Sequence, residues 1–155
     1  MRVLNATALL LWGMLFLSCS PRGAVTPEMA FTSLRDAYNS SDSETFTAQL
    51  SRETIRKIQF ILEKIKKMDR NQCDNFSSKL GSDCNTLKSL TPVDYVSLQL
   101  ALDRKPGNTY FGIVLLSDIT GKKTSPGLCI LRTANGMEIS FVKEGPYWKL
   151  DLKDF

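Results

Sequence analysis

The chain has 155 residues, with 20 Lys and Arg against 16 Asp and Glu, and a formal net charge of +4. This length fits one domain, and 43% hydrophobic with 23% charged residues excludes a disordered chain. The sequence contains no histidine, which excludes His-based triads, His general bases and imidazole-ligated zinc sites. The small positive charge does not by itself indicate a nucleic-acid partner.

The first residues are typical of an export signal. Arg2 precedes an apolar run at residues 8–17, which is shorter than the ~20 residues of a transmembrane helix. The following Phe16-Leu17-Ser18-Cys19 resembles the lipobox of bacterial lipoproteins, in the relaxed form found in spirochaetes, with Phe16 where Leu is usual. The resemblance implies cleavage before Cys19 and attachment of acyl chains such as palmitate to it. The alternative is an ordinary secretory signal with an unmodified Cys19.

The resemblance therefore predicts three segments. Residues 1–18 would be the lipoprotein signal peptide, residues 19–26 a lipidated tether containing Pro and Gly, and residues 27–155 a single folded domain. Such a protein would be anchored by lipid in the bacterial cell envelope, at the outer membrane. Its partners would be the membrane and an envelope or host protein.

The first half of the domain shows helical patterns. Thr26-Pro27 is typical of a capped helix start, and a second such start, Thr91-Pro92, favours a helix in a segment whose alternating apolar residues also fit a strand. We predict a polar, irregular loop at residues 71–90. The predicted helices are 27–39, 43–50, 52–70 and 92–103.

In the second half of the domain the apolar residues recur with a period of two, which is typical of strands. Residues 121–127 are predicted as a loop, and Asn135-Gly136 is a strong hairpin signal. Helices followed by an antiparallel meander define an α+β fold. The predicted strands are 109–119, 128–133, 137–143 and 147–152.

The end of the chain, residues 144–151 (Glu-Gly-Pro-Tyr-Trp-Lys-Leu-Asp), resembles the last strand of small bacterial lipoproteins of the NTF2-like superfamily. The early helix with Ala30, Leu34 and Tyr38, followed by Asp42, is similar to the opening helix of that superfamily. The resemblance implies a cystatin-like cone, in which N-terminal helices pack on a curved four-stranded antiparallel sheet. It bears on the fold and leaves the function open.

Some members of that superfamily are enzymes with acidic and tyrosine side chains inside the cone. Here Tyr95, Tyr110, Asp94 and Asp118 are the residues that a pocket could bring together. Core packing of the tyrosines and capping or turn roles for the aspartates are the favoured interpretation. The sequence shows no phosphate-binding loop or nucleophile elbow, so we expect no enzyme and no cofactor.

Three cysteines follow Cys19. Cys73 and Cys84 flank one polar loop, and we predict a disulfide between them, although three pairings are open. Cys129 would then remain as a small buried residue. Without histidine, the cysteines lack the spacing of a metal site.

The predicted helix 52–70 carries seven basic residues, with Phe60 among them. Within this set Arg56, Lys57, Lys64 and Lys67 are candidates for contact with anionic lipid headgroups or an acidic partner. A solvated helix face is the favoured alternative.

Together these patterns predict a lipid-anchored envelope lipoprotein acting as a non-catalytic binding module. One alternative is an NTF2-like small-ligand carrier or enzyme, which requires an apolar pocket with convergent polar groups. The other is a secreted protein without a lipid.

Overall fold

The computed structural model describes residues 23–107 and 110–153. Within these residues the chain has an α+β fold with seven helices and one four-stranded antiparallel sheet. The helices are α1 (Pro27–Ser40), α2 (Ser43–Ala48), α3 (Arg52–Lys66), α4 (Arg70–Leu80), α5 (Cys84–Ser89), α6 (Pro92–Asp103) and α7 (Tyr110–Leu115). The strands are β1 (Ile119–Ser125), β2 (Leu128–Thr133), β3 (Glu138–Glu144) and β4 (Tyr147–Leu150).

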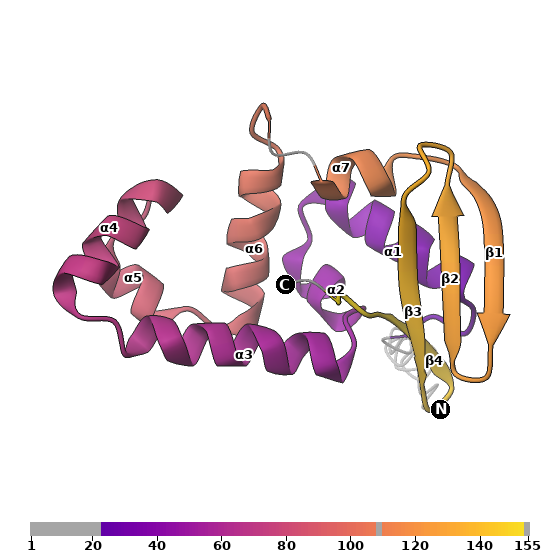
Figure 1. The fold of residues 1–155 in the computed structure, drawn as a ribbon, viewed down its shortest axis with the longest axis horizontal. Coiled ribbons are helices and arrows are strands. Elements are labelled where there is room, and N and C mark those ends of the chain that lie inside the picture. The colour runs from indigo at the N-terminus through magenta and orange to yellow at the C-terminus, as the bar shows by residue number, and fades with distance from the viewer. Residues whose placement is uncertain (1–22, 108–109, 154–155) are drawn as a thin grey trace, which may run out of the picture.

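The elements form an elongated body (Figure 1). The sheet lies at one side of the view, with α1 packed against it and α7 near its upper end. Helix α3 runs away from the sheet along the lower edge, and α4 and α5 lie at its far end. Helix α6 returns between these helices and the sheet.

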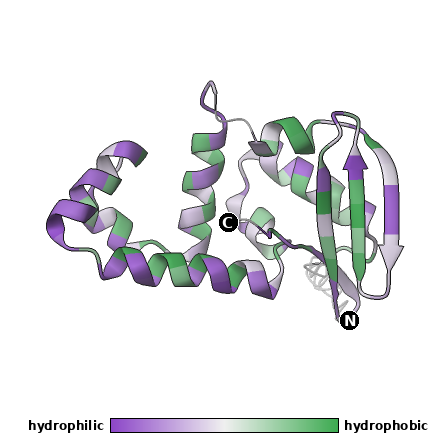
Figure 2. Ribbon diagram, viewed as in Figure 1, coloured by the Kyte–Doolittle hydropathy of each residue, from purple (hydrophilic) through white to green (hydrophobic). Residues whose placement is uncertain are grey.

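The sheet is a simple meander, with the strands in the order β1-β2-β3-β4. Strand β2 is largely hydrophobic, whereas the edge strand β1 is hydrophilic (Figure 2). Exposed lysines on an edge strand oppose pairing with another chain, and β1 carries Lys122 and Lys123. At the other edge, β4 is covered by isolated bridges from Ala24 to Trp148 and from Leu50 to Leu150.

The hydrophobic core extends from the contact of α1 with the sheet to the buried sides of α3 and α6. Phe31 and Leu34 of α1 are buried, as are Leu131 of β2 and Phe141 of β3. Trp148 is also buried, as expected for a large aromatic residue on the last strand. Each such side chain contributes about 1.5–3 kcal/mol of burial free energy.

The predicted starts of α1 and α6 are confirmed. The Thr26 hydroxyl accepts a hydrogen bond from the Met29 amide (3.2 Å). Thr91 and Asp94 form a reciprocal capping box at the start of α6. These contacts join residues three apart, which is why a local pattern could predict both helices.

The prediction of a strand over residues 109–119 is wrong. Tyr110–Leu115 forms α7, and β1 occupies Ile119–Ser125, where we predicted a loop. A short run with apolar residues on both faces fits a strand or a buried helix equally well. The helix is selected by Asp103, whose carboxylate accepts hydrogen bonds from the amides of Phe111 and Gly112 (both 2.9 Å).

The prediction of an irregular loop over residues 71–90 is also wrong. This segment forms α4 and α5. Asp69 caps α4 in a capping box with Gln72, and Asp83 caps α5. The sequence does contain an aspartate-capped helix start here, but the polar composition of the segment favoured a loop. The predicted helix 52–70 correspondingly divides, with α3 ending at Lys66 and Arg70 belonging to α4.

Candidate functional site

A cleft of about 390 Å³ opens between the helices α6 and α7 on one side and the sheet with the C-terminal segment on the other. This volume lies within the range of small-ligand pockets. Its lining combines apolar side chains with several polar groups. The lining residues are Tyr95, Gln99, Tyr110, Phe111, Val114, Leu115, Glu138, Ile139, Ser140, Leu150, Asp151, Leu152 and Lys153.

Helix α7 forms one wall of the cleft and is fixed at both ends by long-range contacts. At its N-terminus, the Asp103 carboxylate also accepts a hydrogen bond from the Tyr38 hydroxyl (3.0 Å). At its C-terminus, the Arg35 guanidinium donates to the carbonyl oxygens of Leu115 and Ser117 (both 2.6 Å). A six-residue helix is marginal by itself, so these contacts from α1 and α6 determine where the wall lies.

The opposite wall is the C-terminal segment 151–153, which the start of α3 holds in place. Ser51 Oγ donates to Asp151 Oδ1 (2.8 Å), and the Leu152 amide donates to Thr54 Oγ1 (3.0 Å). Lys57 Nζ donates to the carbonyl oxygens of Leu152 and Lys153 (2.9 and 2.8 Å). The N-cap of α3, Ser51, and two residues within the helix, Thr54 and Lys57, therefore support this wall of the cleft.

Beside the cleft, α7 presents an apolar ridge to solvent. Tyr110 and Ile113 are each 52% exposed, and Leu116, just after α7, is 58% exposed. Their spacing of three residues places them along one side of the helix. We call these three residues the α7 ridge. Grouped exposed apolar side chains mark interaction surfaces more often than single ones do.

The structure brings together two of the four residues considered for a catalytic pocket. Tyr95 and Tyr110 both line the cleft, whereas Asp94 and Asp118 do not. Burial raises the pKa of the Tyr95 phenol, so its neutral form is favoured. Hydrogen bonds from the Thr91 hydroxyl and amide lower the pKa of Asp94, as expected for a helix cap.

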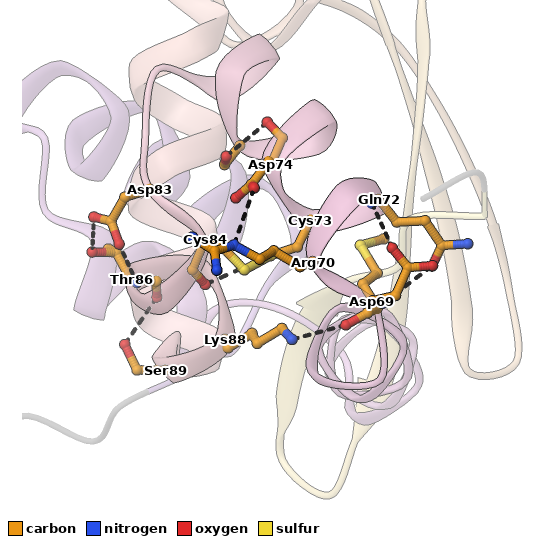
Figure 3. The surroundings of a disulfide bond; sticks show 12 residues. Asp69, Arg70, Gln72, Cys73, Asp74, Asp83, Cys84, Thr86, Lys88 and Ser89 are labelled. Atoms are coloured by element: carbon orange, nitrogen blue, oxygen red, sulfur yellow. Dashed lines mark hydrogen bonds and ion pairs between the residues drawn. A yellow bond between two sulfur atoms is a disulfide. The ribbon is translucent and has the colours of Figure 1, made fainter.

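Cys73 and Cys84 form a disulfide, with their Cα atoms 5.4 Å apart. It joins α4 to the start of α5 (Figure 3), at the end of the body farthest from the sheet. Cys129 is a free, buried cysteine on β2. In the part of the chain that the structure describes, no cluster of three or more potential ligand side chains is placed to hold a metal ion.

Three of the four candidate basic residues, Arg56, Lys64 and Lys67, are exposed, whereas Lys57 is not. Arg56 is exposed and pairs with Glu53 (3.1 Å). Lys64 lies over the ring of Phe60, with its Nζ 4.4 Å from the ring centroid. Lys67 is exposed at the helix C-cap, whereas Lys57 is half-buried against the C-terminal segment.

The predicted lipidation site, Cys19, lies outside the described residues. Across residues 23–107 and 110–153, the structure contains no helix that is both long and apolar enough to cross a bilayer.

Comparison of the chain with protein-family models, with curated proteins and with solved structures finds no match. The candidate site therefore depends on the geometry alone.

Sequence reasoning missed the residues that build the cleft wall. Asp103 ends α6 and Arg35 lies within α1, and neither stands in a recognisable motif. Tyr38 and Asp103 are 65 positions apart. No local signal could have predicted their contact, because only the packing of α1 against α6 and α7 brings them together.

Proposed function

We propose that the protein is a lipid-anchored lipoprotein of the bacterial cell envelope that acts as a non-catalytic binding module. The anchor would be Cys19, at the outer membrane, and the candidate binding surface is the α7 ridge with the adjacent cleft. The main support for the proposal is the position of the α7 ridge relative to the N-terminal end of the described chain. The N-terminal end of the described chain and the α7 ridge lie at opposite ends of the sheet (Figure 1).

This placement supports a binding role because a tether at one end leaves the other end accessible to a partner. Apolar side chains such as Ile113 and Leu116 remain exposed in the isolated chain, and burying them against a partner would be favourable. We propose an envelope or host protein as that partner and no nucleic acid.

The anchor is tested by expressing the chain and its Cys19→Ser variant in a bacterial host with a labelled fatty acid. The wild-type protein should carry the label and enter the detergent phase of a Triton X-114 partition, whereas Cys19→Ser should do neither. Equal labelling of the two proteins would contradict the proposal.

The binding surface is tested by placing a photo-crosslinking amino acid at Ile113, within the α7 ridge, in intact cells. Lys79 on α4 is the matched control, because it is also exposed but lies far from the ridge. We expect a discrete protein adduct from position 113 and none from position 79. Adducts of equal yield from both positions, or from neither, would count against the ridge.

The cleft favours a second candidate function, the carrying of a small apolar ligand. Its volume of about 390 Å³ and its tyrosine, glutamine and serine side chains fit a mostly apolar molecule with one or two polar groups. The NTF2-like cone, which the packing of α1 on a four-stranded meander supports, would place a ligand in a similar position. Catalysis belongs to this alternative as well.

A titration with the neutral apolar dye N-phenyl-1-naphthylamine tests the second candidate. Gln99→Trp should fill the cleft and abolish dye binding, while the control Gln59→Trp, at an exposed position on α3, should leave binding unchanged. If wild type and both variants bind the dye equally, the cleft is not the ligand site.

A further inference from the structure

The chain leaves the folded body at a fixed point beside β4. The Trp148 amide donates to the Ala24 carbonyl (2.8 Å), and Ala24 is buried. Gly23 lies so close to Tyr147 that an added Cβ would stand 2.3 Å from the ring. The four steps from Gly23 to Cys19 span at most about 14 Å. A lipid on Cys19 would therefore hold this point of the body close to the bilayer.

Helix α3 begins at the same place. The Ser51 amide donates to the Leu150 carbonyl (2.7 Å), which tethers the N-cap of α3 to β4. The Arg52 amide donates to Glu144 Oε1 (2.7 Å), next to the β3–β4 turn. From there α3 extends about 22 Å along the lower edge of the body (Figure 1).

The side of α3 that faces away from the body combines positive charge with an aromatic ring. At 100° per residue, Arg56, Phe60 and Lys67 lie within about 20° of the line opposite the buried Ile58. Phe60 is 61% exposed, with Lys64 above its ring. We call these four solvent-facing residues, Arg56, Phe60, Lys64 and Lys67, the outer face of α3.

The acidic residues near this face do not cancel its charge. Glu53 and Glu63 are both exposed and pair with Arg56 and Lys66 (3.1 and 2.8 Å). Such pairs on a helix surface are weak and easily exchanged for other anions. Cations beside anionic headgroups gain free energy, and an aromatic ring is favoured at the level of the headgroups.

We propose that the outer face of α3 lies on an anionic phospholipid bilayer when the chain is anchored at Cys19. The proposal rests on the lipid anchor proposed above and adds to it an orientation and the residues that set it. Lys57 takes no part, because its ammonium group is held by the C-terminal segment.

The opposite orientation, with the α7 ridge in the bilayer, conflicts with the length of the tether. The hydrogen bond from the Lys143 amide to the Gly127 carbonyl places the β1–β2 turn beside the last residues of β3. Lys143 pairs with Trp148, which bonds to Ala24, so this is the end of the sheet where the chain leaves the body. Strand β2 then spans about 17 Å before the sheet reaches α7. A body resting on the α7 ridge would hold Gly23 farther from the bilayer than the tether reaches.

The orientation is tested with nitroxide spin labels on the full chain, purified from a bacterial host and reconstituted in vesicles of 70% phosphatidylcholine and 30% phosphatidylglycerol. Labels are placed at Phe60→Cys and, as the matched control, at Leu116→Cys. The two positions are similarly exposed, at 61% and 58%. Phe60 lies on α3, along the lower edge of the body, and Leu116 lies just after α7, near the upper end of the sheet (Figure 1). Cys129 is buried, Cys73 and Cys84 are bonded to each other, and a lipidated Cys19 has no free thiol, so the native cysteines do not compete for the label.

Power saturation then compares the accessibility of each label to oxygen, which enters the bilayer, with that to a water-soluble nickel chelate. We expect the label at 60 to be protected from nickel and the label at 116 to be fully accessible. In vesicles of phosphatidylcholine alone, the protection at 60 should be lost.

A charge variant tests the source of the orientation. Replacing Arg56 and Lys67 by Gln removes two cations, and at about 1 kcal/mol each this lowers the ratio of docked to undocked protein on the order of 30-fold. The double replacement of Lys79 and Lys105 by Gln makes the same charge change at exposed positions away from the outer face. It should leave the protection at 60 unchanged.

Flotation of the vesicles separates the two proposals. Protein that floats with the vesicles but shows equal nickel accessibility at both labels, or greater protection at 116, overturns the orientation and leaves the anchor standing. Protein that does not float overturns both. Protection at 60 that persists in phosphatidylcholine vesicles overturns recognition of the anionic surface, because the contact with the bilayer would then not depend on lipid charge.

Discussion

The structure makes Asp103 the residue on which the position of α7 depends, and its removal should be costly. The side chain is 5% exposed and accepts three hydrogen bonds, from the Tyr38 hydroxyl and from the amides of Phe111 and Gly112. Replacing a helix cap by Ala costs about 0.5–2 kcal/mol. Each buried donor left without an acceptor costs about 1–3 kcal/mol.

Water can reach part of this site, because Phe111 is only half-buried. We therefore expect Asp103→Ala to lower the free energy of unfolding by about 3 kcal/mol, a large part of the 5–15 kcal/mol typical of a domain. Asp103→Asn keeps one acceptor oxygen and should cost less. Urea unfolding followed by circular dichroism measures both values.

Hydrogen exchange locates the effect. The amides of Phe111 and Gly112 should lose protection in Asp103→Ala. In the control Asp94→Ala, they should not, because this change removes only the exposed Asp94 carboxylate that accepts from Thr91 in the capping box of α6, at a cost of about 1 kcal/mol. If Asp103→Ala changes stability by less than about 0.5 kcal/mol, as an ordinary surface substitution does, the account of α7 is wrong.

Three further predictions concern other contacts. Replacing Cys73 and Cys84 by Ser should lower stability by about 3 kcal/mol, with increased hydrogen exchange in α4 and α5 and unchanged exchange in the sheet; equal changes in both regions would contradict this. Gly112→Ala should lower the midpoint of thermal unfolding, because the new Cβ would stand 2.9 Å from the Tyr38 hydroxyl. Adding Tyr38→Phe to this variant should restore part of the loss. An unchanged midpoint in Gly112→Ala would show that this close approach is absent. Burial, with the nearby Asp103 carboxylate, raises the pKa of the Tyr38 phenol above its ordinary value near 10, so the contribution of Tyr38 to stability is complete below pH 10 and is lost as the pH rises above 10. Urea unfolding at a series of pH values should therefore show a smaller loss of stability at alkaline pH in Tyr38→Phe than in the wild type. An identical loss in both proteins would refute the assignment.

The sequence predicted elements whose signals are local. Thr26-Pro27 and Thr91-Pro92 place cap and helix within four residues, and α1 and α6 begin there. Asn135-Gly136 predicts the β2–β3 connection in the same way. Asp69 and Gln72 form an equally local signal for α4, but the polar composition of the segment outweighed it.

Helix α7 and the cleft could not be predicted in this way. Whether residues 110–115 form a helix or a strand depends on Asp103 and on Arg35, which lies 80 positions before its partner Leu115. The cleft needs the further pairing of Ser51 with Asp151, 100 positions apart. Tyr95 and Tyr110 were singled out as residue types, and only the tertiary structure places them in one cleft.

Both the proposed location of the protein and its orientation on the bilayer depend on the lipid anchor. The anchor is detected by mass spectrometry of the N-terminal peptide from protein extracted out of a bacterial membrane. We expect a peptide that begins at Cys19 and carries the added mass of several acyl chains. A peptide that begins at another residue, or one in which Cys19 is unmodified, would contradict the anchor.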